Sequence, residues 1–258
     1  MLSLEITVPA ALLWDVDGTL AETELQGHRR AFNRAFAEAG LPWRWDGTRY
    51  AQLLAISGGR ERLRHFLSQA TGTCPSEGQV EALQSSKTRH YGALVEAGEL
   101  QLRPGVRRLM AAAAAAGVAQ AVVTTSGRAA VRALLDRQLP EHPRWLQFWI
   151  CGEDVQHKKP HPEAYSLALQ RLALPAATVL AIEDSANGVA AATAAGLAVL
   201  AVRSASSAGE PAEAFRAAAA ELDQLGEPDG PALTVRQGPA CPGGQVTLSY
   251  LQQLLSAP

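Results

Sequence analysis

Lysine is scarce in this sequence. Among the 23 Lys and Arg side chains of the 258-residue chain, only Lys87, Lys158 and Lys159 are lysines, and all the others are arginines. A chain that takes nearly all its positive charge from arginine has no general need for lysine at its surface. The adjacent pair Lys158 and Lys159 therefore needs a specific explanation.

Cysteines are equally few and lie far apart. Cys74, Cys151 and Cys241 show no paired spacing, which argues against a disulfide framework or a zinc site and favours a reducing compartment such as the cytoplasm. Apolar stretches such as 197–202 are far shorter than the about 20 residues that span a bilayer. The N-terminal stretch carries Glu5 and no Lys or Arg before its apolar run, so we expect no targeting leader.

Charge is also below average. Charged residues make up 19% of the chain, against about 25% in typical globular proteins, and the formal net charge is −2. The sequence has no basic stripe with interleaved aromatics, so we expect neither a nucleic-acid nor a membrane partner. With 47% hydrophobic residues, a chain of this length can bury a sizeable core. We expect a globular monomer that acts on a small molecule.

Strand-like and helix-like segments alternate along most of the chain. Short apolar runs predict strands at 11–16, 118–123, 148–150, 178–182 and 198–202, and helical patterns lie between them at 106–116, 129–138, 162–172 and 186–195. Such alternation is typical of βαβ units. The predicted fold class is therefore α/β, with a Rossmann-like parallel sheet core.

The first predicted strand is followed by a long helical insert. Expected helices in it are 24–39, 50–56, 61–70 and 76–97. We predict a core domain formed by residues 1–20 and 101–258, with a helical cap domain, 21–100, inserted after the first strand. An insert at the carboxyl end of a strand would overhang the edge where open α/β sheets bind ligands.

The C-terminal stretch carries no functional signal. Its Pro- and Gly-rich part, 226–244, predicts a loop with one short strand at 233–236. Residues 246–255 predict a closing helix.

Acidic residues end two of the predicted strands. Asp15 and Asp17 lie in the segment DVDGT and point to the same side, because strand side chains alternate. Glu183 and Asp184 end the strand TVLAIED. If the two strands are parallel neighbours, four carboxylates converge and need a cation, for which Mg²⁺ is a natural candidate. Taken singly, the first pair could be an Asx-rich turn, and one acid of the second pair a helix cap.

Two further segments could hold a phosphate. A compact ammonium from Lys158 or Lys159 would offset the negative charge of carboxylates and phosphate. Thr124, Thr125 and Ser126 follow a strand, where hydroxyls and free N–H groups form an anion cradle. Taken alone, the lysines could be solvated surface residues, although their scarcity argues against this. The segment 124–126 taken alone favours an ordinary helix cap.

Together and in this order, the four segments resemble the four motifs of the haloacid dehalogenase superfamily of phosphohydrolases. The likeness covers about residues 11–205, and the insert resembles the small helical cap of the subgroup with β-phosphoglucomutases and phosphoglycolate phosphatases. The segments DVDGTLAETELQGHRRAFNRAF and SGGRER are similar to the CbbY proteins, especially the plant and cyanobacterial ones, which dephosphorylate xylulose 1,5-bisphosphate, an inhibitor of Rubisco. One departure is Arg60, where the family usually has Lys; Arg keeps the charge and can bind a phosphate bidentately.

The resemblance implies how the acids divide the chemistry. Asp15 would be the nucleophile that forms an aspartyl-phosphate. Asp17 would protonate the leaving sugar oxygen and then deprotonate the hydrolytic water. Mg²⁺ would be held by Asp15, the backbone carbonyl of Asp17 and Asp184, with Glu183 supporting the metal from nearby.

The resemblance also implies which residues bind the substrate. Thr124 and Lys159 would hold the transferring phosphoryl oxygens, with Thr125 and Ser126 beside them. Substrate choice would fall to residues at the start of the cap and in its SGGRER segment: Glu22, Glu24, His28, Gly58, Gly59, Arg60 and Arg62. The arginines could bind a second phosphate. The plainer interpretation of the arginines is a solvated helix face. Glu22 and Glu24 could simply stabilise the first turn of a helix, where acidic residues are favoured.

Several functions stay open at this point. The predicted one is a Mg²⁺-dependent phosphatase of a small sugar bisphosphate, with xylulose 1,5-bisphosphate as the expected substrate. A β-phosphoglucomutase-like phosphomutase would differ in how well the closed cap excludes water. A phosphatase of another sugar monophosphate or of phosphoglycolate is a further alternative. A non-catalytic regulatory domain comes last, because it is expected to lack an acid or the lysine.

Overall fold

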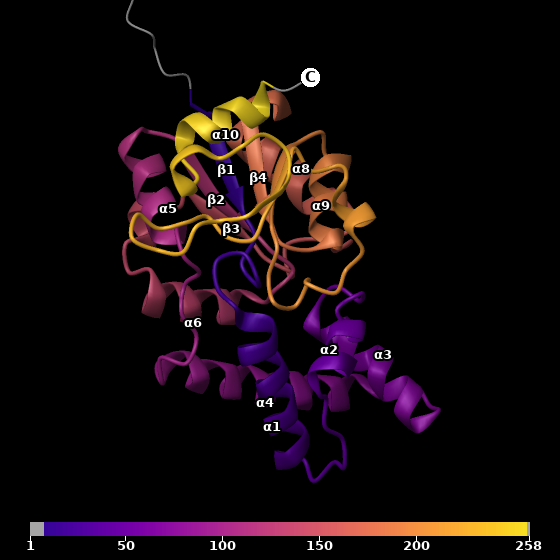
Figure 1. Ribbon diagram of the computed structural model, residues 1–258. Helices are drawn as coiled ribbons and strands as arrows, with labels where there is room; N and C mark the ends of the chain where they lie inside the picture. The colour runs from indigo at the N-terminus through magenta and orange to yellow at the C-terminus, as the bar shows by residue number, and fades with distance from the viewer. Residues whose placement is uncertain (1–7, 257–258) are drawn as a thin grey trace, which may run out of the picture.

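The computed structural model describes residues 8–256, and a seven-stranded sheet forms its centre (Figure 1). In sheet order the strands are β3 (Phe148–Ile150), β2 (Ala119–Val123), β1 (Ala11–Trp14), β4 (Val179–Glu183), β5 (Ala198–Val202), β6 (Ala220–Leu222) and β7 (Val235–Gln237). All neighbours from β3 to β6 are parallel, and only β7 pairs antiparallel. The predicted α/β class with a parallel core is confirmed.

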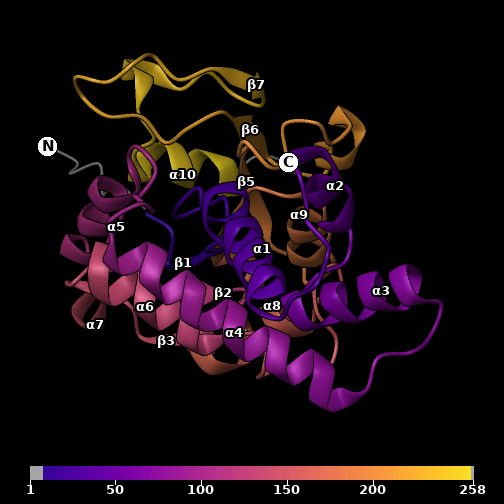
Figure 2. The same cartoon turned by 90° about the horizontal axis from the view of Figure 1, so that it is seen from below.

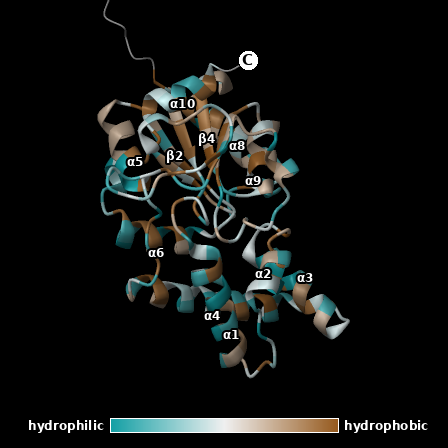
Figure 3. Ribbon diagram, in the orientation of Figure 1, coloured by the Kyte–Doolittle hydropathy of each residue, from teal (hydrophilic) through white to brown (hydrophobic). Residues whose placement is uncertain are grey.

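The sheet is buried on both faces because its strands are apolar on both sides. In β1, Leu12 and Trp14 face one core cluster, and Ala11 and Leu13 face the other. The first cluster packs against α5 (Val106–Ala115), α6 (Arg128–Gln138) and α10 (Leu248–Leu255), and the second against α8 (Glu163–Leu172) and α9 (Ala186–Ala194). In Figure 3, β2 and β4 are accordingly brown. A short helix, α7 (His142–Trp145), precedes β3.

The insert forms a group of helices beyond the carboxyl ends of the strands (Figure 1). It consists of a π-helix, η1 (Glu24–His28), and α1 (Arg29–Glu38), α2 (Gly47–Leu53), α3 (Gly59–Thr71) and α4 (Glu77–Glu96). Its own core contains Phe32, Phe36, Trp45, Tyr50 and Phe66, and α1 crosses α4 and packs against it (Figure 2). We call η1 to α4 the cap; the domain boundaries at 20/21 and 100/101 stay a prediction.

Local sequence explains where the cap helices begin and end. Ser76 forms a capping box with Gln79 at the start of α4. Asp46 accepts from the Arg49 N–H at the start of α2. Gly72 ends α3 in the left-handed conformation (φ 70°), which a glycine adopts without strain. These signals act within a few residues and are therefore readable from sequence.

One element differs from the prediction, and one strand, β6, lies where no element was predicted. The expected helix 24–39 is divided, because its first turn is the π-helix, in which Gly27 packs so closely on Tyr91 and Leu100 that a Cβ would lie 2.9 Å from both side chains. Strand β6 lies in a stretch of helix-forming alanines, yet pairing with β5 buries Ala220 and Leu222 completely. Strand pairing in the folded sheet therefore overrides the helix propensity of these alanines. Among residues 8–256, no helix is long and apolar enough to cross a membrane.

Candidate active site

Lys159 is the centre of the buried cluster at the ends of β1, β2 and β4. Its Nζ donates to Asp15 Oδ1 (2.7 Å), Glu183 Oε1 (2.6 Å) and the Val123 carbonyl (2.8 Å). Burial alone would lower the pKa of Lys159, but the two carboxylates raise it above its usual value. The ammonium stays charged and joins three strand ends at one point.

Glu183 lies beneath the cluster and orients it. Its side chain is completely buried and also accepts a short hydrogen bond from the Tyr165 hydroxyl. Its other oxygen, Oε2, has no hydrogen-bond partner among the described residues, and it lies where a Cβ on Gly188 would be only 1.8 Å away. Glycine at position 188 therefore makes room for this carboxylate. Glu183 faces Lys159 and Tyr165 and does not line the cleft.

Asp184 faces the cleft and is held by the loop after β5. Ser204 Oγ donates to its Oδ2 (2.5 Å). Gly18 lies against the same oxygen with φ 90°, and a Cβ there would be 2.0 Å from it. The glycine of DVDGT is therefore needed twice, for its backbone conformation and for its lack of a side chain.

Three carboxylates could hold a metal ion. Asp15, Glu183 and Asp184 each offer an oxygen within 4.8 Å of the others. Burial, and then mutual repulsion, raises the pKa of Asp15 and Asp184 well above the usual range. Oxygen donors that repel one another in a buried site fit a hard divalent cation such as Mg²⁺. Because Asp15 and Asp184 line the cleft and Glu183 does not, Asp15 and Asp184 are the two carboxylates best placed as direct ligands.

The carboxylate of Asp17 lies outside this metal-binding group and turns toward the cap. It accepts from Thr23 Oγ1 (2.6 Å), lies 2.7 Å from His28 Nε2 and accepts a short hydrogen bond from Ser126. Burial would raise the pKa of Asp17, but His28 and the three hydrogen bonds lower it below the usual range. His28 itself stacks on Tyr91 at 4.3 Å. Of the four carboxylates that the sequence predicts to converge, three therefore lie close enough together to share a metal ion.

Thr124 and Thr125 stand at the end of β2, on the wall of the same cleft as Asp15 and Lys159. Thr124 is buried, and its Oγ1 accepts from the Ser126 N–H (3.1 Å). The hydroxyls thus lie beside the ammonium, as a phosphate cradle requires.

The cleft has two adjacent small lobes. The first, about 60 Å³, contains the acids, the cradle, Lys159 and Asn187. The second, about 30 Å³, is formed by the cap and by the segment after β2; its walls are Glu24, His28, Phe32, Gly58, Gly59, Arg62, Gln84, Lys87, Thr125, Ser126 and Gly127. Glu24, Arg62 and Thr125 line both lobes. One ligand that reaches both lobes would therefore touch core and cap together.

Glu24 and Arg62 form a buried polar group at the junction of the lobes. The Tyr50 hydroxyl donates to Glu24 Oε2 (2.6 Å) and accepts from Arg62 Nη1 (2.8 Å). Arg62 Nε also donates to the Leu53 carbonyl (3.2 Å), and only 5% of the residue is exposed. Arg62 is therefore a fixed donor group and does not lie on a solvated helix face.

Lys87 and Gln84 on α4 supply unpaired polar atoms to the second lobe. Within the described part of the chain, no carboxylate or hydrogen-bond acceptor pairs with Lys87 Nζ. This atom lies over the rings of Phe32 (5.2 Å from the ring centroid) and Tyr91 (5.5 Å). Burial lowers the pKa of Lys87 to about 8. Gln84 Oε1 is buried and also without a partner in residues 8–256. Unpaired buried polar groups that face one cavity indicate a place for a polar ligand.

The structure does not bring Arg60 and Glu22 to the cleft. Arg60 Nη2 lies 3.2 Å from Glu77 and forms a short pair with Glu81, so its side chain turns outward along α4. Glu22 lies 3.3 Å from Arg103 Nε and accepts from the Ala205 N–H (3.2 Å). Both side chains make ion pairs, which sequence spacing alone does not predict.

An ion pair and hydrogen bonds join the cap to the core next to the cleft. Lys158 Nζ lies 2.5 Å from Glu61 Oε1 on α3. Asn187 Nδ2 at the start of α9 donates to Ser57 Oγ and to the Ala55 carbonyl (3.2 Å each). These contacts explain the second lysine of the adjacent pair: Lys159 belongs to the acid cluster, and Lys158 to the contact between core and cap.

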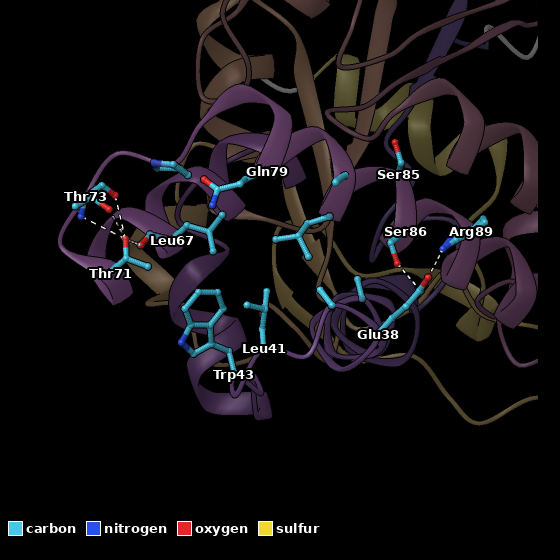
Figure 4. Close-up of a pocket in the computed structure, with 15 residues that line it drawn as sticks. Glu38, Leu41, Trp43, Leu67, Thr71, Thr73, Gln79, Ser85, Ser86 and Arg89 are labelled. Atoms are coloured by element: carbon cyan, nitrogen blue, oxygen red, sulfur yellow. Dashed lines mark hydrogen bonds and ion pairs between the residues drawn. The ribbon is translucent and has the colours of Figure 1, made fainter.

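A larger cavity of about 520 Å³ lies within the cap, between α1, α3 and α4 (Figure 4). Leu41, Trp43 and Leu67 line it, and Glu38 pairs with Arg89 at one end (2.7 Å). Its wall is mainly apolar and its charged groups are paired. Among the described residues, this cavity therefore lacks the unpaired charged groups that line the smaller cleft.

Several residues of the site could not be identified from the sequence. Tyr165, Ser204, Tyr50, Gln84 and Lys87 belong to no motif and reach the site only through the fold. Lysine scarcity is a signal for Lys87, because it is the only lysine outside the adjacent pair. The other four residues, two of which are tyrosines, have no comparable signal in their local sequence.

Known proteins share this architecture. The haloacid dehalogenase-like hydrolase family matches residues 9–196. The chain is 44% identical to the plasmid-borne Protein CbbY of Cupriavidus necator over 227 residues, 86% of this chain and 87% of that protein. It is 37% identical to the CBBY-like protein of Arabidopsis thaliana over 230 residues, 86% of this chain and 71% of that protein.

Solved structures agree. CbbY from Rhodobacter sphaeroides in complex with phosphate is 39% identical, with a TM-score of 0.78 over 84% of this chain and 94% of that one. A mutant of that protein in complex with xylulose-(1,5)bisphosphate is 36% identical, with a TM-score of 0.79 over 92% of this chain and 100% of that one.

Proposed function

Because the chain belongs to the haloacid dehalogenase-like hydrolase family, we propose that it is a Mg²⁺-dependent phosphatase of a small sugar bisphosphate, namely xylulose 1,5-bisphosphate. The observation that carries the proposal is the buried cluster in which Lys159 holds Asp15 beside Asp184 and the threonine cradle. The bisphosphate-bound relative supports the choice of substrate.

Asp15 is the nucleophile of the proposed reaction. Lys159 holds its Oδ1, so Oδ2 is the oxygen available to attack phosphorus. The new bond makes an aspartyl-phosphate as the bond from phosphorus to the sugar oxygen breaks. Mg²⁺ bound by Asp15 and Asp184 would neutralise charge on the carboxylate and the phosphoryl oxygens. The hydroxyl of Thr124 would hold the same oxygens. The ammonium of Lys159, whose three N–H bonds go to Asp15, Glu183 and Val123, would offset their charge.

Asp17 moves the protons. In the structure its carboxylate is kept ionised by His28, Thr23 and Ser126. An incoming phosphate dianion opposes that ionisation, because like charges raise the pKa of a carboxyl group. Asp17 therefore takes up a proton as substrate binds, gives it to the leaving oxygen and later removes one from the hydrolytic water.

The second lobe accounts for a second phosphate. Lys87 and Arg62 are buried cations at that lobe, and Lys87 has no anionic partner among the residues described. A non-reacting phosphate there would pair with Lys87 and be positioned by charge-assisted hydrogen bonds. A monophosphate leaves the ammonium buried and unpaired, which disfavours it.

The proposal is tested by phosphate release in excess Mg²⁺. We expect xylulose 1,5-bisphosphate to have the highest kcat/KM in a panel with ribulose 1,5-bisphosphate, xylulose 5-phosphate, phosphoglycolate and β-glucose 1-phosphate. Asp15→Asn should abolish release, whereas Asp229→Asn, an exposed loop aspartate, should not change it. Preference for a monophosphate would overturn the substrate, isomerised sugar phosphate without free phosphate would identify a mutase, and activity in Asp15→Asn would overturn the mechanism.

A further inference from the structure

Two imidazoles and a carboxylate gather at the surface, in and next to the segment that carries Lys158 and Lys159 and outside the catalytic cluster. His157 Nδ1 lies 2.8 Å from Glu163 Oε2, and His161 Nδ1 lies 3.9 Å from the same oxygen. The two rings are 4.7 Å apart between centroids. All three ligand atoms fit within 4.8 Å of one another, and the imidazole side chains are 64% and 52% exposed.

The backbone holds this group in place. Glu163 begins α8, and its carboxylate accepts from the N–H groups of Gln156 (2.8 Å) and His157 (2.9 Å). His161 Nδ1 accepts from the Glu163 N–H (3.2 Å), so this nitrogen is unprotonated, and a metal ion would take its lone pair in place of that hydrogen bond. His157 Nδ1 lies 2.8 Å from the Glu163 carboxylate, and an ion bound there would replace the shared proton. Hydrogen bonds that orient the ligand side chains are a regular feature of protein metal sites.

The donor set selects a different ion from the catalytic cluster. Imidazole nitrogen suits Zn²⁺, Co²⁺ and Ni²⁺, whereas Mg²⁺ prefers oxygen. Tetrahedral zinc with bonds of about 2.1 Å places its ligand atoms about 3.4 Å apart. The distances from Glu163 Oε2 to His157 Nδ1 (2.8 Å) and to His161 Nδ1 (3.9 Å) lie on either side of that value. Both rings are exposed and can rotate to bring these distances to the tetrahedral value.

We propose that His157, His161 and Glu163 form a second metal site, for Zn²⁺ or a similar transition-metal ion, with water as the fourth ligand. The two histidines flank Lys158 and Lys159 in the chain. A bound ion would therefore restrain the segment that supplies both the Lys159 cluster and the Lys158–Glu61 pair.

Direct metal binding tests the proposal. Untagged protein is titrated with Co²⁺ and, separately, with Zn²⁺ in a large excess of Mg²⁺, which keeps the acidic cluster filled with its own ion. We expect one Zn²⁺ per chain by calorimetry and a visible Co²⁺ absorption band typical of nitrogen ligation. Asp184→Asn should leave this binding unchanged, which separates the site from the catalytic cluster.

Matched histidine variants decide between the site and nonspecific binding. His157→Ala and His161→Ala should each weaken Zn²⁺ binding at least about tenfold, and Glu163→Gln, which keeps the shape of the side chain, should do the same. His90→Ala is the control, because His90 pairs with Glu38 on the cap, away from this cluster. Circular dichroism confirms that each variant is folded. Equal zinc affinity in His157→Ala and His90→Ala, or no binding by the wild type, would overturn the proposal.

Discussion

Replacing Lys87 by methionine removes a buried charge while keeping most of the side-chain volume. Only 5% of Lys87 is exposed. Its ammonium lies over the rings of Phe32 and Tyr91 and has no carboxylate partner among the described residues. Burial lowers its pKa from 10.5 to about 8, with Asp17 and Glu24 opposing that shift. The free enzyme therefore carries an uncompensated charge in the lobe that we assign to the second phosphate.

The shift in pKa sets the expected effect on stability. A difference of about 2.5 pKa units corresponds to roughly 3 kcal/mol. Because the folded state binds this proton less tightly, the charge destabilises the fold below about pH 8, and the effect disappears as pH rises toward 10.5. Lys87→Met should thus raise the free energy of unfolding at pH 7 by about 1–3 kcal/mol, a rise in Tm of roughly 2–10 °C.

Catalysis should change in the opposite direction. Loss of a charge-assisted hydrogen bond of about 1.5–3 kcal/mol predicts a KM for the bisphosphate about 10- to 100-fold higher, with little change for monophosphates. In the wild type that KM should rise as pH increases through about 8, and in Lys87→Met this dependence should be absent. The matched control is Arg89→Met, an exposed cation on the same helix that pairs with Glu38.

Thermal melting and steady-state kinetics on the same preparations distinguish substrate binding by Lys87 from a purely structural role. A lower Tm for Lys87→Met together with an unchanged KM would show that the ammonium supports the fold and does not bind substrate. An equal rise in KM for mono- and bisphosphates would refute the assignment of the second lobe to the distal phosphate.

Three further substitutions test the geometry of the cleft. Gly18→Ala places a Cβ 2.0 Å from Asp184 Oδ2 and should abolish phosphate release; near-normal turnover would contradict the claim that this contact shapes the site. Ser204→Ala removes the 2.5 Å hydrogen bond to Asp184 and should raise the Mg²⁺ concentration for half-maximal activity several-fold, so an unchanged Mg²⁺ titration would argue against Asp184 as a ligand. Lys158→Met breaks the pair with Glu61 and should lower the free energy of unfolding by less than about 1 kcal/mol. In stopped-flow binding experiments it should also speed substrate entry into the cleft of only about 60 Å³. Identical entry rates would show that this pair does not hold the cap.

Much of the core site follows from local sequence. The acids of DVDGT and TVLAIED and the threonines after β2 stand where strands end, and parallel strands end at one sheet edge. Local sequence does not contain the strand order, and the acids converge only if β1 and β4 are neighbours. The structure meets that condition, and Lys159 joins the group.

Cap residues are harder to assign from sequence. In SGGRER, Arg60 and Arg62 lie two positions apart on α3 and so face different sides of the helix. Arg62 turns to Tyr50 and the cleft, and Arg60 to the acids of α4. The choice between them depends on which side of α3 the core covers, and no local pattern contains that information.

The sequence by itself determined the α/β sheet, the helical insert and the order of the chemical groups, because alternation of apolar segments and residue type at strand ends act over a few residues. Only the tertiary structure decided that Asp17 turns to His28, that Lys87 and Gln84 face the second lobe, and that Glu22 and Arg60 do not reach the cleft. Those outcomes depend on burial and charge pairing between segments tens of residues apart, which are set when the cap packs over the sheet.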